Sequence, residues 1–334
     1  MRISFIIPVF NTKQTLHDCV ESIFNQHLKE VSFEIVLVND GSTDGSADIC
    51  RELADHTHAI QVVNQKNLGV SAARNCGIWA ARGDYLCFLD SDDNLIDNEL
   101  CTILPYCDGK NDLIRFWCHL NDAGSSLDYS TGDGSVSFSG YGLDYLRQFG
   151  IETLCTNYLY RRQFLIENNL FFVPGIVGED FSFIFDVMMA NPLIVSIARR
   201  LYQYNISPNS ISTSRSPENS RRWVKDLIGT LSRITQDIEP LRTSDPALYK
   251  SCRLSLDDKS KALFSRMLSA KYTTREFREI LSSCRATGLL PQQKQTNTSV
   301  YLLSHFPILY PLASQLFCHI FLPYIYPKLN RNGH

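Results

Sequence analysis

Two hydrophobic patterns alternate along the first part of the chain. Residues 3–9 form an almost continuous apolar run, which is typical of a central parallel strand covered on both faces. In residues 15–27 the apolar side chains recur at helical spacing instead, at Leu16, Cys19, Val20, Ile23 and Phe24. The alternation continues downstream, with strands expected at 33–39, 60–64 and 85–89 and helices at about 46–56 and 70–81. Strands that alternate with helices predict a doubly wound α/β sheet.

The second half of the chain is less regular until a helical pattern takes over. A strand is expected at 113–119, and the Gly-, Ser- and Asp-rich stretch 121–140 is typical of a hairpin or loop. Helices are expected at 141–149, 161–168 and 181–189, and a short strand at 201–204. Beyond about residue 217 the spacing is helical throughout. We therefore predict an α/β domain at 1–215 and a helical C-terminal region at 216–334.

The composition of the chain disfavours some classes of function. A chain of 334 residues with 44% hydrophobic content is able to bury a core. Its net charge of −3 disfavours a general nucleic-acid binder, because such proteins neutralise phosphates with a basic surface. The 11 cysteines show no zinc-ligand spacing, and Cys87, Cys118 and Cys318 lie in apolar runs. This usage predicts buried free thiols in a reducing cytoplasm.

The end of the chain is unusually apolar. Residues 295–327 contain no Asp, Glu, Lys or Arg, and Lys328 and Arg331 follow directly. Prolines divide this stretch into pieces shorter than the about 20 apolar residues that a membrane-spanning helix needs. Two interpretations stay open. Residues 295–331 make a peripheral contact with the inner face of the cell membrane, or they form a terminal helical pair that packs on its own domain.

The carboxyl ends of the predicted strands are where an α/β sheet binds its ligands. One of these ends carries Asp90-Ser91-Asp92-Asp93, directly after an apolar strand. Carboxylates this close repel one another unless a cation lies among them, and oxygen ligands suit Mg²⁺ or Mn²⁺. A solvated acidic turn is the alternative interpretation, but the position at a strand end favours the metal.

Two further strand ends carry candidate ligand groups. Asp40, in the turn 39–45, stands where a carboxylate would accept the imide N–H of a uracil, although Asp and Gly are common in any strand–helix turn. The stretch 67–77 opens a helix with small residues, and helix N-terminal amides favour an anion. Arg74, one turn into that helix, is expected to reach a phosphate with a forked pair of hydrogen bonds. Close helix–sheet packing would explain the same small residues.

Together these motifs resemble those of the family-two glycosyltransferases with the GT-A fold, a Rossmann-like nucleotide-binding mixed sheet with flanking helices. The family's PVYN, SIL-Q and VNDGSTDGS motifs are similar to residues 8–11, 22–26 and 38–46. Its N-G-S-ARN-G and G-Y--FLDSDD motifs are similar to 67–77 and 83–93, and its ED motif is similar to Glu179-Asp180. The resemblance covers roughly residues 1–215 and fades after that.

The resemblance implies a role for each matching residue. Asp92 and Asp90 would ligate Mn²⁺ or Mg²⁺ at the diphosphate, and Asp180 would be the general base, with Glu179 beside it. Asn205 departs from the pattern, since many relatives carry Arg at this place. The donor-binding residues would be Pro8, Val9, Phe10, Asn11, Asp40, Asn67, Arg74, Asp90, Ser91 and Asp93.

The function implied by the resemblance is inverting sugar transfer. The donor would be a nucleotide diphosphate sugar, with UDP favoured, and the acceptor a hydroxyl of a glycan or lipid-linked glycan. The layout is similar to that of bacterial enzymes of capsule and O-antigen synthesis, which work at the inner face of the cell membrane.

Three other classes fit less well. A nicotinamide enzyme is disfavoured because no GxGxxG follows the first strand. A phosphatase with a DxD nucleophile would leave Asp40 and Arg74 unexplained. A non-catalytic nucleotide-sugar binding protein on the same fold predicts the loss of a metal or base carboxylate, and all of these are present.

Overall fold

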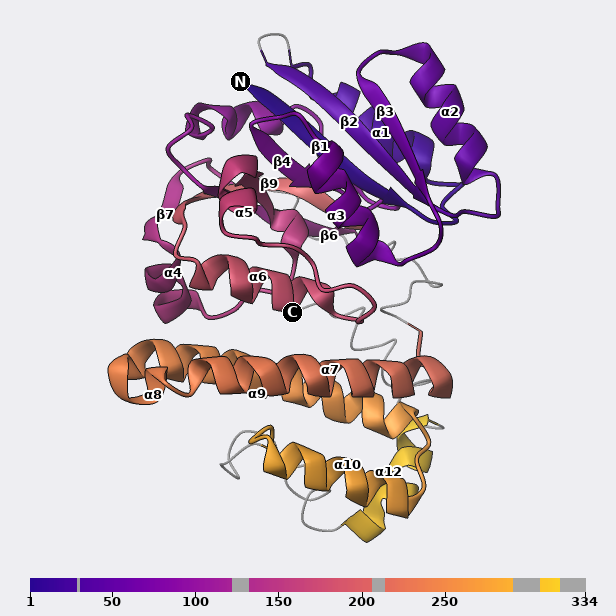
Figure 1. Cartoon of the computed structure of the whole chain (residues 1–334), viewed down its shortest axis with the longest axis vertical. Coiled ribbons are helices and arrows are strands. Elements are labelled where there is room, and N and C mark those ends of the chain that lie inside the picture. The colour runs from indigo at the N-terminus through magenta and orange to yellow at the C-terminus, as the bar shows by residue number, and fades with distance from the viewer. Residues whose placement is uncertain (29–30, 122–131, 206–213, 291–306, 319–334) are drawn as a thin grey trace. The chain divides into compact units, whose positions relative to one another are not determined.

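The computed structural model describes residues 1–28, 31–121, 132–205, 214–290 and 307–318 (Figure 1). The chain divides into two compact units. The first contains Met1–Asn121, the described part of Ser126–Tyr145, and Thr153–Ile206. The second contains Leu146–Glu152 and the described part of Ser207–His334.

A mixed sheet forms the centre of the first unit. Its nine described strands run in the order β3-β2-β1-β4-β8-β6-β9-β5, and β7 pairs with β9. β1, β2, β3 and β4 are parallel, whereas β8 is antiparallel to β4 and ends the parallel half. The strands are β1 (Arg2–Val9), β2 (Ser32–Asp40), β3 (Ile60–Gln65), β4 (Tyr85–Phe88), β5 (Asn94–Leu95), β6 (Leu113–Asn121), β7 (Val136–Tyr141), β8 (Tyr158–Arg161) and β9 (Leu193–Asn205).

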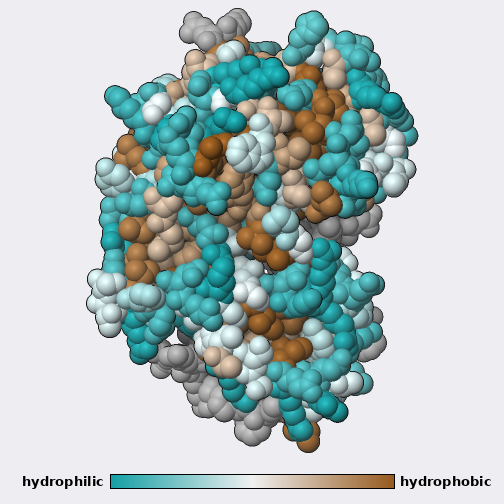
Figure 2. All heavy atoms as spheres, viewed as in Figure 1, coloured by the Kyte–Doolittle hydropathy of each residue, from teal (hydrophilic) through white to brown (hydrophobic). Residues whose placement is uncertain are grey.

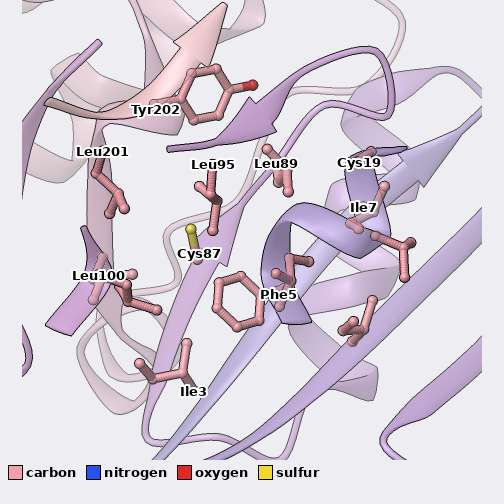
Figure 3. Packing of buried hydrophobic residues seen from close by; sticks show 14 of the residues in the cluster. Ile3, Phe5, Ile7, Cys19, Cys87, Leu89, Leu95, Leu100, Leu201 and Tyr202 are labelled. Carbon is pink, nitrogen blue, oxygen red and sulfur yellow. The ribbon is translucent and has the colours of Figure 1, made fainter. Parts of the chain in front are cut away.

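Helices cover both faces of this sheet. Ile3, Phe5 and Ile7 of β1 lie in the core cluster that α1 and α2 cover, and Figure 3 shows Phe5 beside Cys87 of β4. Because strand side chains alternate, Ile6 points to the other face, where it meets α3. The helices are α1 (Leu16–Phe24), α2 (Ser46–His56), α3 (Val70–Ala80), α4 (Gly142–Phe149), α5 (Arg162–Glu167) and α6 (Glu179–Met189), with short 3₁₀ helices η1 (Leu100–Thr102), η2 (Leu104–Tyr106) and η3 (Cys155–Asn157).

The approach of α3 to the sheet is close. A Cβ atom at Gly77 would lie 2.2 Å from Cγ2 of Ile6, so a larger residue does not fit without movement. Close helix–sheet packing therefore explains the glycine at this position of the 67–77 motif.

The predicted mixed α/β fold with a helical C-terminal region is confirmed. The prediction was less accurate in the second half, where β7 and β8 were not expected as strands and 201–204 is only the end of the longer β9. Arg199 and Arg200 interrupt the apolar run of β9, which hides the strand in the sequence. Residues 122–131 of the expected loop and the stretch 206–213 lie outside the described residues.

The second unit is helical where it is described. Ser216 accepts a hydrogen bond from the Asn219 N–H with Pro217 in the first turn, and Thr273 forms a capping box with Glu276. Within the described parts of the chain, no helix combines the length and apolar character needed to cross a membrane. The helices are α7 (Pro217–Ile238), α8 (Leu241–Ser244), α9 (Pro246–Ser269), α10 (Thr274–Ala286), η4 (Pro307–Leu309) and α12 (Tyr310–Leu316).

Two helix glycines provide a matched test of this packing. Gly77→Ala should lower the free energy of unfolding by about 1–3 kcal/mol, because the new methyl group overlaps Ile6. Gly229→Ala in α7 should raise it by about 0.5–1 kcal/mol, because no atom lies within 4 Å of the new Cβ and alanine favours a helix. Urea unfolding followed by circular dichroism measures both. A Gly77→Ala variant as stable as the wild type would contradict the close approach of α3.

Candidate active site

Three loops meet at one edge of the sheet. β1 pairs in parallel with both β2 and β4, so the carboxyl ends of the three strands point the same way. The polar residues expected to bind a ligand stand there: Asn11 after β1, Asp40 at the end of β2, and Asp90 after β4. The structure therefore brings together the motifs that the sequence separates by up to eighty residues.

Asp40 ties the end of β2 to the loop that opens α3. Its Oδ1 accepts hydrogen bonds from the Leu68 N–H (2.8 Å) and Gln65 Nε2 (2.7 Å), and its Oδ2 accepts one from the Gly69 N–H (2.9 Å). The residue is only 3% exposed. A carboxylate offers about four lone-pair sites, so these bonds leave Oδ2 with room for a further donor such as a nucleobase imide.

The loop after β1 presents one side chain to solvent. Pro8 and Val9 are buried in the strand, whereas Phe10 is 44% exposed at its end. Asn11 adopts a positive φ of 54°, and its side chain accepts a hydrogen bond from the Thr43 N–H (2.8 Å). Phe10 is thus available to lie against a planar ligand, while Pro8 and Val9 offer only their backbone.

The turns after β2 and β3 are in direct contact. Gly41 has a φ of 72°, and a Cβ atom there would lie 2.9 Å from the backbone N of Asn67. The turn therefore requires glycine both for its backbone conformation and for the space beside it. This contact places the backbone of Asn67 beside the Asp40 turn.

Arg74 of α3 is the centre of a buried ionic cluster. Its Nη1 donates to Glu179 Oε1 (2.7 Å) and Asp180 Oδ1 (2.8 Å), and its Nη2 donates to Asp90 Oδ1 (2.8 Å). The Arg74 side chain is 3% exposed, and its guanidinium carbon lies 5.1 Å from the centre of the Phe172 ring. One side chain thus joins α3, the end of β4 and the start of α6, across 106 positions of sequence.

This geometry does not fit the expected phosphate contact of Arg74. Both terminal nitrogens of the guanidinium are occupied by carboxylates, and the group is buried. Arg74 instead positions the carboxylates that face the open edge. The expected phosphate contact of Arg74 stays a prediction, and nothing in the sequence indicated the ion pairs with Glu179 and Asp180, because those residues are remote in the chain.

Glu179 and Asp180 form the first turn of α6. Gly178 precedes them in the left-handed conformation (φ 76°), and two acidic side chains at a helix N-terminus suit its dipole. The Asp180 side chain is 20% exposed and that of Glu179 is 12% exposed. Burial, followed by the charge of Asp180, raises the pKa of Glu179 to about 7. The pair therefore begins the helix and also belongs to the Arg74 cluster.

The acidic turn Asp90–Asp93 is fixed by residues of α1 and β9. The Tyr202 hydroxyl donates to Asp93 Oδ2 (2.5 Å) and accepts from the Asp90 N–H (3.2 Å). The Asn205 N–H donates to Asp93 Oδ1 (2.7 Å), and its side-chain amide donates to the Asp92 carbonyl (2.9 Å). From the other side, Thr15 donates to the carbonyl of Ser91 (2.8 Å).

Asp93 therefore has a structural role. It is 1% exposed, and both of its carboxylate oxygens accept hydrogen bonds from β9. Burial, followed by the charge of Asp90, raises its pKa to about 8. This arrangement does not fit the expected contact of Asp93 with the donor, because the side chain points into the protein.

Asp92 lies in an environment that disfavours its charged form. Burial, followed by the charge of Asp90, raises its pKa to about 6. No group of three metal-ligating side chains occurs in the part of the chain that the structure describes. Asp92 and Asp90 still fit Mg²⁺ or Mn²⁺, because such ions are commonly held by one or two carboxylates with substrate phosphates and water completing the shell.

Sequence reasoning missed several residues that shape the site. Tyr202 and Thr15 hold the acidic turn, Phe172 lies under the guanidinium, and burial, with a contribution from the charge of Asp180, raises the pKa of Cys155. None of them belongs to a polar motif. No sequence signal marks them, because each acts through a contact with a residue that is remote in the chain.

The comparison with known families agrees with this site. The sequence profile of glycosyl transferase family 2 matches residues 4–166. The matched part of the chain, residues 4–166, belongs to this family. Glycosyltransferase GlyA of Streptococcus pneumoniae is 28% identical over 251 residues, which cover 70% of this chain and 34% of GlyA. The minor teichoic acid biosynthesis protein GgaB of Bacillus subtilis is 26% identical over 84% of this chain and 31% of its own length. The chain thus spans about a third of these two relatives.

Solved structures share the fold of this family-2 chain. S. aureus TarS 1–349 in complex with UDP-GlcNAc matches with a TM-score of 0.62 and 18% identity, over 94% of this chain and 89% of TarS 1–349. The mannosyltransferase PcManGT from Pyrobaculum calidifontis, in complex with GDP-Man and Mn²⁺, matches with a TM-score of 0.53 and 13% identity, over 95% of this chain and 86% of PcManGT. At these identities the likeness concerns the fold.

The raised pKa of Glu179 predicts a pH-dependent stability difference. Its pKa rises from an ordinary 4.5 to about 7 on folding, so the protonated group favours the folded state, and this contribution is lost as pH rises from about 4.5 to about 7. The Glu179→Gln variant does not titrate at this position, so it does not lose stability in this way as the pH rises. The stability of Glu179→Gln relative to the wild type should therefore be greater at pH 8 than at pH 5. Urea unfolding at both pH values, with the exposed Glu52→Gln as control, measures this, and a pH-independent difference would contradict it.

Proposed function

We propose that this chain is an inverting glycosyltransferase that moves a sugar from a UDP-sugar to a hydroxyl of a glycan or lipid-linked glycan acceptor. The observation that carries the proposal is the Arg74 cluster. It holds the carboxylate at the end of β4 next to the Glu179–Asp180 pair of α6. Donor and base residues are therefore adjacent, as a single displacement requires.

The donor is assigned to the loops after β1, β2 and β4. Asp40 has a remaining acceptor site for the imide of uracil, and Phe10 exposes its ring beside it. Asn11 shapes these loops through its side chain, and Asn67 and Ser91 do so through their backbones. UDP as the nucleotide is supported by TarS, which binds UDP-GlcNAc on the same fold.

Asp180 is assigned as the general base. It would take the proton of the acceptor hydroxyl while that oxygen bonds to the anomeric carbon, and the bond to the diphosphate oxygen breaks with its electron pair on the leaving group. Attack from the opposite side inverts the anomeric carbon. Asp180 is preferred over Glu179 because its side chain is more exposed, at 20% against 12%. Arg74 holds it in place.

A divalent cation is assigned to Asp92 and Asp90. Such a cation would neutralise the charge that develops on the leaving nucleoside diphosphate. The raised pKa of Asp92 supports this assignment, because the buried carboxylate gains from a positive neighbour. PcManGT, which has the same fold, is in complex with Mn²⁺.

The acceptor is assigned to a bacterial surface polymer or its lipid-linked precursor. The relative GgaB takes part in minor teichoic acid biosynthesis, which supports this class. We assign the transfer chemistry to the catalytic domain at 1–215 and leave 216–334 as a helical region outside it. A nucleotide-sugar binding protein without catalysis is the second candidate, and the presence of every expected carboxylate disfavours it.

The metal assignment predicts that nucleotide binding depends on Mn²⁺. Calorimetry of UDP binding should show an affinity about tenfold or more lower with chelator than with Mn²⁺, equivalent to roughly 1.4 kcal/mol or more. Asp92→Asn should bind UDP with the lower affinity whether or not Mn²⁺ is present. The exposed Asp48→Asn serves as a matched control. A wild-type affinity that chelator leaves unchanged would remove the metal from donor binding.

The base assignment predicts a selective loss of transfer. Asp180→Asn keeps an oxygen for Arg74 but removes the basic carboxylate, so UDP affinity should be unchanged and turnover should fall by about 10²–10⁴-fold. Turnover at saturating donor and acceptor is the measurement. A loss below about fivefold would exclude Asp180 as the base, and a large loss in Glu179→Gln alone would move the role to Glu179.

A further inference from the structure

The short segment η4–α12, residues 307–316, is fixed to the second unit by one side only. The Tyr310 hydroxyl donates to the Met267 carbonyl (2.5 Å), and its ring stacks on Phe277 with centroids 4.0 Å apart. One turn later, Ser314 donates to the carbonyl of Leu268 (2.7 Å). Tyr310 and Ser314 therefore mark the inner face of the segment, which lies on α9 and α10.

The opposite face is apolar and exposed. Ile308, Leu312 and Leu316 follow one another at intervals of four residues, and they are 71%, 59% and 49% exposed. Leu309 extends the stripe and is 45% exposed. Side chains four residues apart lie on the same face of a helix. A side chain two residues after either of them lies on the opposite face. The leucines are thus exposed to solvent because Tyr310 and Ser314, on the opposite face, are bound to α9.

The position of the segment fits this exposure. Figure 2 shows hydrophobic atoms projecting at the bottom of the view, where Figure 1 places the yellow α12. Adjacent apolar side chains this exposed mark an interaction surface more often than scattered single ones do. We call Ile308, Leu309, Leu312 and Leu316 the α12 stripe.

Charge decides between the candidate partners of the α12 stripe. Within 271–290 and 307–318, the described residues include four Lys and Arg against two Glu, in a chain whose net charge is −3. One of the two glutamates, Glu276, is paired with Arg221 (2.9 Å). The exposed Lys271 stands beside α12, where it lines a hollow of about 290 Å³ together with Tyr272, Pro311, Ser314, Gln315 and Cys318. An apolar stripe beside an exposed lysine, on a part of the chain with a net positive charge, is complementary to anionic lipid.

A second copy of the chain fits less well. Stable protein interfaces bury about 800 Å² on each partner, and four part-exposed side chains on so short a segment fall short of that area. Two basic surfaces would also repel each other.

We propose that the α12 stripe inserts into the surface of a membrane and that Lys271 meets the phosphate of an anionic lipid. This goes beyond the proposed sugar transfer and does not depend on it. It also resolves the two interpretations of the apolar tail for its described part: one face of the segment packs on its own unit, and the other meets lipid.

The test is flotation of the full chain, without nucleotide, with phosphatidylcholine vesicles that do or do not contain phosphatidylglycerol. The wild type should float with the anionic vesicles. Leu312→Gln/Leu316→Gln should bind them at least about tenfold more weakly, because burying a leucine is worth about 1.5–3 kcal/mol. Leu254→Gln, at a residue of α9 that is 54% exposed, is the matched control and should float like the wild type. Lys271→Gln should weaken binding to anionic vesicles by about fivefold, the effect of roughly 1 kcal/mol per lysine.

Three results would overturn the proposal. They are a wild type that does not float, a double variant that floats as well as the wild type, and a Leu254→Gln variant that loses flotation to the same extent. Light scattering of the same variants completes the test. A wild-type dimer that only the double variant abolishes, without flotation, would assign the stripe to a protein interface. Because the flotation test contains no nucleotide, its failure would not contradict the proposed sugar transfer. A failed transfer assay would likewise not contradict membrane binding by the α12 stripe.

Discussion

The buried guanidinium of Arg74 is the interaction on which the geometry of this site depends. It gives one N–H group to each of three carboxylates, which come from the end of β4 and the start of α6. Breaking a buried ion pair by removing one partner costs about 3–5 kcal/mol, because the other charge stays buried without compensation. Here one removal would leave three part-exposed carboxylates without their shared positive partner. The same side chain thus holds the fold together at this edge and sets the distance between the two halves of the site.

The strand β9 fixes the other side of the acidic turn. Its contacts give the three carboxylates of the turn different surroundings. Asp90 is paired with Arg74, and Asp93 is buried against Tyr202 and the Asn205 backbone. Asp92 lies between these two anchors with its pKa raised by burial. Three chemically identical groups, adjacent in the sequence, therefore have three different environments. Of the two that have no cationic partner among the described residues, Asp93 has both oxygens bonded to β9 and Asp92 is the more exposed.

The local features of this protein were predictable from sequence, and the long-range ones were not. The apolar run of β1 and the helical spacing of α2 depend on neighbours in the chain, so their elements appear close to the expected places. The role of Arg74 depends on Asp180, which is 106 residues away, and a motif gives no such distance. The burial of Asp93 was not predictable for the same reason, since its partner Tyr202 is 109 residues away.

The charge of the site gives the cation a physical reason that is independent of family resemblance. Asp40, Asp90, Asp92, Glu179 and Asp180 line or adjoin the edge where an anionic diphosphate would bind. Arg74 does not offset the charge of that ligand, because its terminal nitrogens are already shared among carboxylates. A diphosphate would therefore meet an uncompensated negative field, which opposes binding in a part-buried site. A divalent cation at Asp92 reverses the sign of that field where the phosphates would lie, and the burial that raises the pKa of Asp92 strengthens the attraction.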